Sequence, residues 1–313
     1  MIKKQFCAIL LLLLPFFLVI FAPQAAKGAA NGLVLWFNQV LPVLFPFSFI
    51  LQLIIASDAL SVVSPLTAPV IGKLFHLSAP CGFCILSGFL CGFPMGAMTA
   101  SQALEHKMIS REEAQLLAGI CNHASPMFFT GYTLNQTLPE HPLKPFLLLI
   151  FYISPLLWLW IRCLFRHHFH PSLSTKPITA AFENKRQIFP TRILLLNSAE
   201  LMLKIGVCMM FFSIFQEIIR SLPFISPSSA AVLSLFLEIT SGSAAISRLP
   251  WTEFQKTIFI MGGTAFGGLC IAFQSYTVLK SKTLSFVQYL ADKSAVGIIT
   301  AALVWILYQI MGR

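Results

Sequence analysis

Long apolar runs alternate with short polar segments along the chain of 313 residues. A helix needs about 20 consecutive apolar residues to cross a bilayer. Runs that reach or approach this length cover about 6–22, 32–56, 146–165, 193–219 and 286–310. The pattern predicts an all-α polytopic membrane protein with about seven to eight spans plus two re-entrant hairpins.

The first apolar run has some features of a signal peptide. It follows the basic start at residues 1–4, and small residues come after it at Ala25, Ala26, Ala29 and Ala30. The run is long for the core of a signal peptide, however, and further spans follow it. We therefore expect a retained first membrane helix.

Other apolar stretches are interrupted too often to be plain spanning helices. Residues 80–98 read PCGFCILSGFLCGFPMGAM, with glycine and proline at short intervals. Irregular backbone survives at membrane depth only where protein or a water-filled cavity satisfies it, so we expect a re-entrant hairpin or a broken helix here. A short helix at 99–107 should follow. Next come a capping box formed by Ser110 and Glu113 and an interruption at Pro126 and Gly131.

The second half of the chain repeats this order. After the span at 193–219 comes an apolar piece at 226–247, interrupted at Glu238, and then a segment at 257–278 with two glycine pairs. Each half reads as a span, a hairpin, a broken span and a span, and the two halves start on opposite sides of the membrane. Opposite starting sides predict an inverted repeat, the plan of many secondary transporters.

Composition and charge agree with a membrane protein. Hydrophobic residues make up 57% of the chain and charged residues 10%, whereas soluble domains carry about 25% charged residues. This excludes a disordered chain and an ordinary soluble enzyme. The net charge of +10 comes from basic residues in loops, densest at 162–192, and indicates topology rather than nucleic-acid binding. The positive-inside rule places this loop and the N-terminus, with Lys3 and Lys4, in the cytoplasm.

These features predict four regions. An N-terminal membrane helix and loop occupies 1–30, and the first repeat occupies 31–165. A basic cytoplasmic loop at 166–192 then leads into the second, inverted repeat at 193–313.

No cofactor or metal ion is expected, although a coupling proton or sodium ion suits a transporter. Cys81 and Cys84 form a C-x-x-C without a second pair of ligands, and buried cysteine behaves as a small hydrophobe. Metal binding is also the less favoured interpretation for the three histidines within 167–170, and packing is favoured over proton relay for His123. The sequence lacks the motifs of hydrolases, metalloproteases and nucleotide-binding enzymes, so no enzyme activity is expected.

In an inverted repeat the solute site lies near the membrane midplane, where the interrupted segments meet. Helix ends and bare carbonyls supply ligating groups there. For any single glycine, close helix packing through a small residue is the favoured alternative. The candidate substrate-binding or gating residues are Ser87, Gly88, Gly92, Pro94, Gly96, Asn122, Ser125, Pro126, Glu238, Thr240, Gly242, Ser243, Gly268 and Gln274.

Ionisable residues inside apolar runs are costly and mark either function or a pair. Glu238 has no basic residue within four positions, so proton coupling and a structural hydrogen bond both remain open. Glu200 and Lys204 are spaced for a helical ion pair. Asp292 and Lys293, in the last run, are expected to snorkel or to have partners.

Several stretches occur in an order and spacing that are fairly specific. They are 36–47 (WFNQVLPVLFPF), 87–97 (SGFLCGFPMGA), 109–114 (ISREEA), 121–128 (CNHASPMF), 238–242 (EITSG) and 266–275 (FGGLCIAFQS). Together they resemble the YlbJ-like sporulation integral membrane proteins, which carry the nucleoside-recognition Gate domain. The resemblance covers about 36–290, so each predicted repeat would be of the Gate type.

The resemblance implies a multi-pass transport protein of endospore-forming bacteria, in a membrane around the forespore, with dipicolinic acid as its solute. We expect helix N-termini to hold this dianion without a buried arginine, and polar side chains at the interruptions to ligate it. Nucleoside transport is the alternative within this class, because the wider Gate group includes nucleoside transporters. A non-transporting membrane scaffold in spore maturation is the alternative from another class. The expected partners are the solute, the lipid bilayer and, in a homo-oligomer, further copies of the chain.

Overall fold

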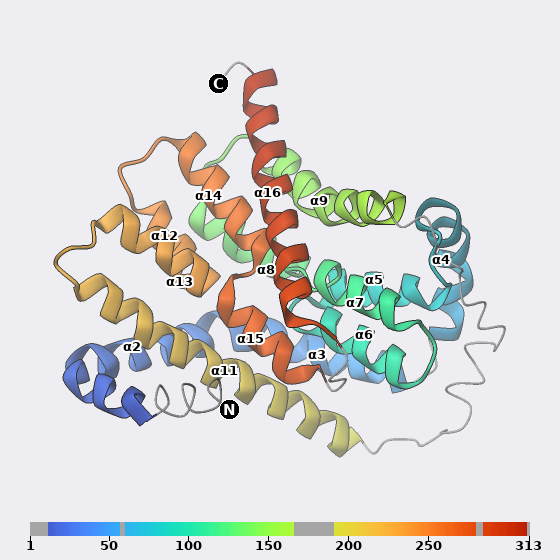
Figure 1. Ribbon diagram of the computed structural model, residues 1–313, viewed down its shortest axis with the longest axis horizontal. Coiled ribbons are helices and arrows are strands. Elements are labelled where there is room, and N and C mark those ends of the chain that lie inside the picture. The colour runs from blue at the N-terminus through green and yellow to red at the C-terminus, as the bar shows by residue number, and fades with distance from the viewer. Residues whose placement is uncertain (1–11, 57–59, 166–190, 280–283, 312–313) are drawn as a thin grey trace, which may run out of the picture.

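The computed structural model describes residues 12–56, 60–165, 191–279 and 284–311, and helices form nearly all of these ranges (Figure 1). The all-α class is therefore confirmed. The elements are α2 (Ala22–Leu35), η1 (Trp36–Val40), α3 (Leu41–Ala56), α4 (Leu60–Phe75), α5 (Pro80–Cys91), α6 (Met95–Glu105), α7 (Arg111–Ile120), α8 (Pro126–Phe128), η2 (Phe129–Thr137), α9 (Lys144–Leu164), α11 (Thr191–Ser221), α12 (Pro227–Leu237), α13 (Ile239–Ser247), α14 (Glu253–Phe266), α15 (Gly268–Val278) and α16 (Phe286–Ile310).

Several of the helices are long and apolar enough to cross a membrane. Within the described ranges there are five such helical stretches, and a sixth if the pair Leu66–Phe75 and Pro80–Cys91, bent by 100°, is one span. The protein is thus a multi-pass membrane protein. The number of seven to eight spans, the inverted repeat and the four-region division stay predictions.

The spans α9, α11 and α16 lie where the apolar runs predict them. The second span, predicted from residue 32, begins earlier, because α2, η1 and α3 form one continuous helical stretch from Ala22. Helix α16 has the predicted bounds, and its first turn is capped by Ser285, whose Oγ accepts from the Gln288 amide at 3.3 Å. In the second apolar run, η1 is a π-helix in which the Leu41 amide bonds to the Trp36 carbonyl, five residues back. The run continues through Pro46 as α3.

Four helix breaks interrupt the remaining apolar segments. We number them along the chain: the first break is 92–94, the second is 121–125, the third is Glu238 and the fourth is Gly267. Gly92 and Gly267 have φ values of 81° and 92°, a backbone region that glycine adopts without a steric penalty. Three of these breaks lie within the predicted interrupted segments at 80–98, 226–247 and 257–278.

The second break differs slightly from the prediction. It precedes Pro126, which forms the first position of α8, because a residue without an N–H is tolerated at a helix start. Gly131 lies inside the π-helix η2 and breaks nothing. The capping box is confirmed, since Ser110 Oγ accepts from the Glu113 amide and Glu113 Oε2 accepts from the Ser110 amide.

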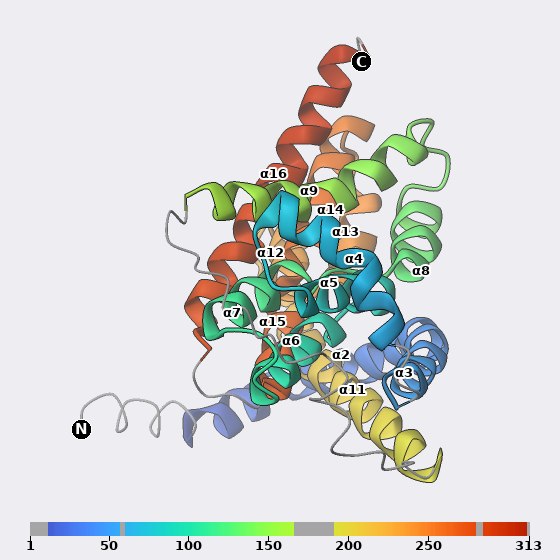
Figure 2. The same ribbon diagram turned by 90° about the vertical axis from the view of Figure 1, so that its right-hand side faces the viewer.

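Helices near each end of the described chain pack against helices from elsewhere in the sequence. Figure 2 shows α16 standing across α9, and the two helices are in contact. Helix α2 lies against α11, where a Cβ on Gly28 would sit 2.7 Å from Ile214 Cα. Lys27 Nζ lies 2.5 Å from Glu217 Oε1 across the same contact. The N-terminal helix is therefore packed against a helix from the other half of the chain.

Candidate functional site

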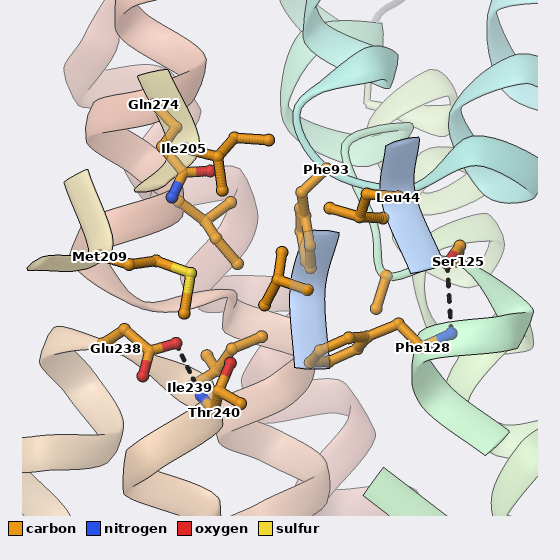
Figure 3. Close-up of a pocket in the computed structure, with 13 residues that line it drawn as sticks. Leu44, Phe93, Ser125, Phe128, Ile205, Met209, Glu238, Ile239, Thr240 and Gln274 are labelled. Carbon is orange, nitrogen blue, oxygen red and sulfur yellow. Dashed lines mark hydrogen bonds between the residues drawn. The ribbon is translucent and has the colours of Figure 1, made fainter. Parts of the chain in front are cut away.

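A small cavity of about 40 Å³ lies where segments at the four helix breaks approach one another (Figure 3). Helices α3 and α11 complete its wall, together with Val40 of η1. Apart from four polar side chains, the lining is apolar. The lining residues are Val40, Leu44, Phe93, Ala124, Ser125, Phe128, Ile205, Met209, Glu238, Ile239, Thr240, Ile271 and Gln274.

The first-half wall consists of the first and second breaks packed together. A Cβ on Gly92 would sit 2.8 Å from the Ser125 amide nitrogen, so only glycine allows the two breaks to approach this closely. A Cβ on Gly96 would similarly crowd the carbonyl carbon of Cys121, at 2.5 Å. Ser125 caps α8 by accepting the Phe128 amide at 3.3 Å. These glycines serve close packing, and their packing positions the cavity wall.

The second-half wall is organised by Glu238 at the third break. Its carboxylate accepts the Thr240 and Ser241 amides, each at 2.8 Å, and the Ser241 hydroxyl at 2.7 Å. It is therefore the N-cap of α13. Figure 3 shows the same side chain beside Thr240 at the cavity. Glu238 thus makes the structural hydrogen bonds that the sequence left open, while also lining the cavity.

A hydrogen bond links the two halves of the chain beside the cavity. The Tyr132 hydroxyl of η2 donates to the Thr240 carbonyl of α13 at 2.6 Å. Within the second half, Gln216 of α11 donates to the Ser234 carbonyl at 2.8 Å and accepts from Ser241 Oγ at 2.5 Å. These bonds fix α13 both to η2 and to α11.

A second cluster of buried polar side chains lies beside the cavity. Asn122 Nδ2 donates to Ser275 Oγ at 2.6 Å and to the Tyr289 hydroxyl at 2.7 Å. Lys293 Nζ donates to the Asn122 carbonyl at 2.8 Å and lies 5.1 Å from the centre of the Phe93 ring. We call Asn122, Ser275, Tyr289 and Lys293 the polar cluster. Phe93 joins it to the cavity.

The structure brings part of the predicted site together. Ser125, Glu238, Thr240 and Gln274 line the cavity, and Asn122 belongs to the adjacent polar cluster. The other candidates lie at the breaks or in the helices that support them, outside the lining. They are Ser87, Gly88, Gly92, Pro94, Gly96, Pro126, Gly242, Ser243 and Gly268.

Sequence reasoning missed two kinds of site residue. Ile205 and Met209 line the cavity from α11, which reads as a plain apolar span and carries no local signal. Lys293 was expected to snorkel or to have a partner, yet its side chain is 1% exposed. Its charge inside an apolar run was the signal that could have placed it in a site.

Other charged residues are partnered. The expected pair of Glu200 and Lys204 is confirmed at 2.6 Å. Asp292 lies 3.3 Å from Arg162 and accepts from the Trp158 ring nitrogen at 3.0 Å.

His123 and the two cysteines of the C-x-x-C fit packing roles. His123 is buried, with Nε2 at 3.0 Å from the Phe151 carbonyl and its ring 4.0 Å from that of Phe151. Cys81 and Cys84 are free thiols. The described part of the chain contains no group of three metal-ligating side chains. The histidines within 167–170 lie outside the described residues.

A known family model matches the part of the chain that forms the first-half wall, and one known protein is similar over nearly the whole chain. The sequence model of the Gate family, described as "Nucleoside recognition", matches residues 37–134. The chain is 26% identical over 339 aligned positions to the sporulation integral membrane protein YlbJ of Bacillus subtilis (strain 168), with 96% of this chain and 83% of that protein covered. The resemblance to the YlbJ-like proteins is confirmed. No solved structure matches the chain significantly. The Gate match contains the first and second breaks and therefore the whole first-half wall.

Proposed function

We propose that the protein transports a small polar or anionic solute across a membrane, with dipicolinic acid during sporulation as that solute. The observation that carries the proposal is the cavity formed where segments at four helix breaks meet. Broken helices at such a junction supply the binding groups of many secondary transporters. The solute assignment rests on the similarity to a sporulation integral membrane protein.

The size of the cavity favours a carrier that changes conformation. A volume of about 40 Å³ holds about three water molecules. Sites for small organic ligands span roughly 300–1,000 Å³. The walls must therefore separate before a solute enters, as alternating access requires. A proton or sodium ion would drive the cycle.

The remaining features of the proposal follow from charge and similarity. The N-terminus and the basic loop at 166–192 face the cytoplasm, and the protein lies in a membrane around the forespore. It is not an enzyme. Nucleosides are the second candidate solutes, because the Gate family is described by nucleoside recognition.

Solute flux into proteoliposomes tests the proposal. Dipicolinate and uridine are offered separately, with and without a proton gradient, to the wild type and to Gln274→Leu, which changes a cavity side chain. Gln309→Leu is the control, since Gln309 is exposed on α16. Saturable dipicolinate flux that falls at least tenfold in Gln274→Leu alone supports the proposal. Saturable uridine flux alone transfers it to nucleosides. Absence of both fluxes in folded protein overturns it in favour of the scaffold.

A further inference from the structure

Lys293 places a basic side chain in the buried part of the last membrane helix. It is 1% exposed and lies seven residues after the start of α16 at Phe286. An ionisable group at such a position is costly to keep and calls for a partner or a function.

The partners of Lys293 do not neutralise it. Nζ donates to the Asn122 carbonyl at 2.8 Å and lies over the Phe93 ring. In the ranges that the structure describes, no carboxylate lies within 4.0 Å of Nζ. The adjacent Asp292 is paired elsewhere, with Arg162 of α9 at 3.3 Å.

Asn122 provides a second, independent sign of a missing ligand group. Its Nδ2 has two acceptors, but its Oδ1 is buried and has no donor among the described residues. A buried acceptor without a donor costs free energy. Within the described ranges, the polar cluster therefore contains both a lysine amine without a carboxylate partner and an acceptor, Asn122 Oδ1, without a donor.

Two of the helix N-termini at this cavity are already capped by side chains. The Glu238 carboxylate already occupies the first amides of α13. Ser125 Oγ accepts the Phe128 amide at the start of α8. The expectation that helix ends alone hold the dianion therefore loses two of its helix ends, and Lys293 is the cation next to the cavity.

Phe93 stands between this cation and the cavity. Its side chain lines the cavity (Figure 3). Lys293 Nζ lies 5.1 Å from the Phe93 ring centre, although Lys293 is not part of the lining. The Phe93 ring therefore separates the cavity from Nζ.

We propose that Lys293 binds a carboxylate group of the solute and that Phe93 is the side chain that closes this subsite. The ligand class is a small carboxylate, aromatic or aliphatic, and a ligand that also carries a hydrogen-bond donor would in addition satisfy Asn122 Oδ1. This inference deepens the proposed function and rests on it.

Equilibrium binding of radiolabelled dipicolinate to the purified full chain tests the charge. Lys293→Gln removes the cation and keeps a donor, Lys293→Arg keeps the cation, and Lys204→Gln changes an exposed lysine of α11. Pyridine-2,6-dicarboxamide is the uncharged probe. We expect Lys293→Gln to weaken dipicolinate binding at least tenfold, Lys293→Arg to retain part of it, and diamide binding to change less than twofold. Equal dipicolinate affinity in the wild type and Lys293→Gln overturns the inference.

Chemical labelling tests the closure and does not depend on a folded Lys293 variant. A water-soluble amine reagent is applied to the wild type and to Phe93→Ala, and modification of Lys293 is read by peptide mass spectrometry against exposed Lys204. We expect at least fivefold more labelling of Lys293 in Phe93→Ala, and protection by dipicolinate. Unchanged labelling overturns the role of Phe93. Uridine flux without carboxylate binding overturns the inference alone, whereas loss of all flux and binding in the wild type overturns the proposed function as well.

Discussion

Asn122 Nδ2 donates to the Tyr289 hydroxyl at 2.7 Å and so joins the second helix break to the last membrane helix. Ser275 of α15 takes part in the same contact, because it accepts from Asn122 at 2.6 Å and from Tyr289 at 3.2 Å. One amide therefore connects the second break with α15 and α16, at residues 153 and 167 positions further along the chain. Any rearrangement of the second break must break or carry these bonds.

Removing the Tyr289 hydroxyl tests this connection. Tyr289→Phe keeps the ring and its stacking on Phe286 but removes one acceptor from Asn122. We expect the free energy of unfolding in detergent to fall by about 0.5–1.5 kcal/mol. Tyr276→Phe, at a side chain that is 56% exposed, should change stability by less than about 0.5 kcal/mol. Equal stability of both variants would contradict a structural contribution from this bond.

Gly92 is expected to tolerate no side chain. Its φ is 81°, and a Cβ would sit 2.8 Å from the Ser125 amide nitrogen. Gly92→Ala should destabilise the fold by about 1–3 kcal/mol and reduce solute flux, because the first and second breaks would be pushed apart. Gly131→Ala is the matched control, since nothing lies within 4 Å of a Cβ there. Thermal unfolding and flux of the two variants can be compared directly, and similar losses in both would argue against this packing.

The capping role of Glu238 can be tested separately from the role of its charge. Glu238→Ala removes the acceptor for the Thr240 and Ser241 amides and should cost about 0.5–2 kcal/mol of stability. Glu238→Gln keeps one acceptor oxygen and should retain more of that stability. If the charge couples proton movement to transport, Glu238→Gln loses gradient-driven flux while keeping solute exchange. Full gradient-driven flux in Glu238→Gln would restrict Glu238 to capping.

The buried ion pair of Arg162 with Asp292 should contribute more to stability than the exposed pair of Lys204 with Glu200. Asp292 is fully buried and Arg162 is 25% exposed, so removing the cation in Arg162→Met leaves a buried carboxylate with one fewer partner. We expect a loss of about 1–3 kcal/mol, below the value for fully buried pairs because water screens Arg162. Lys204→Met breaks the exposed pair with Glu200 and should leave the unfolding curve unchanged. Denaturant unfolding of both variants decides the order, and a larger loss in Lys204→Met would contradict it.

Local features of the fold could be predicted because their causes are local. The bounds of α16, the capping box at Ser110 and the break at Glu238 follow from apolar run length, capping chemistry and a polar residue inside an apolar segment. In the segment 257–278, the predicted break at the first glycine pair is wrong. This pair, 262–263, continues α14, and only the second pair interrupts the helix, because glycine permits a break without requiring one.

The cavity itself could be predicted only in part. Polar residues inside interrupted apolar segments can be recognised from the sequence. Four of them line the cavity, namely Ser125, Glu238, Thr240 and Gln274. Apolar lining residues such as Met209 have the same local pattern as residues that face lipid. The relation between Phe93 and Lys293 depends on which helices pack together, and no periodicity within either segment encodes that choice.

The contact between α2 and α11 has a consequence for synthesis. Gly28 and Gly32 allow the backbone of α2 to lie close to the backbone of α11. A side chain at either position would force the two helices to move apart. Yet α11 leaves the ribosome only after most of the first half, and at about 5–20 residues per second this delay is on the order of 10–40 s. During that interval α2 is a membrane helix without its permanent neighbour. The face of α2 that contacts α11 is therefore uncovered during synthesis until α11 is inserted and packs against it.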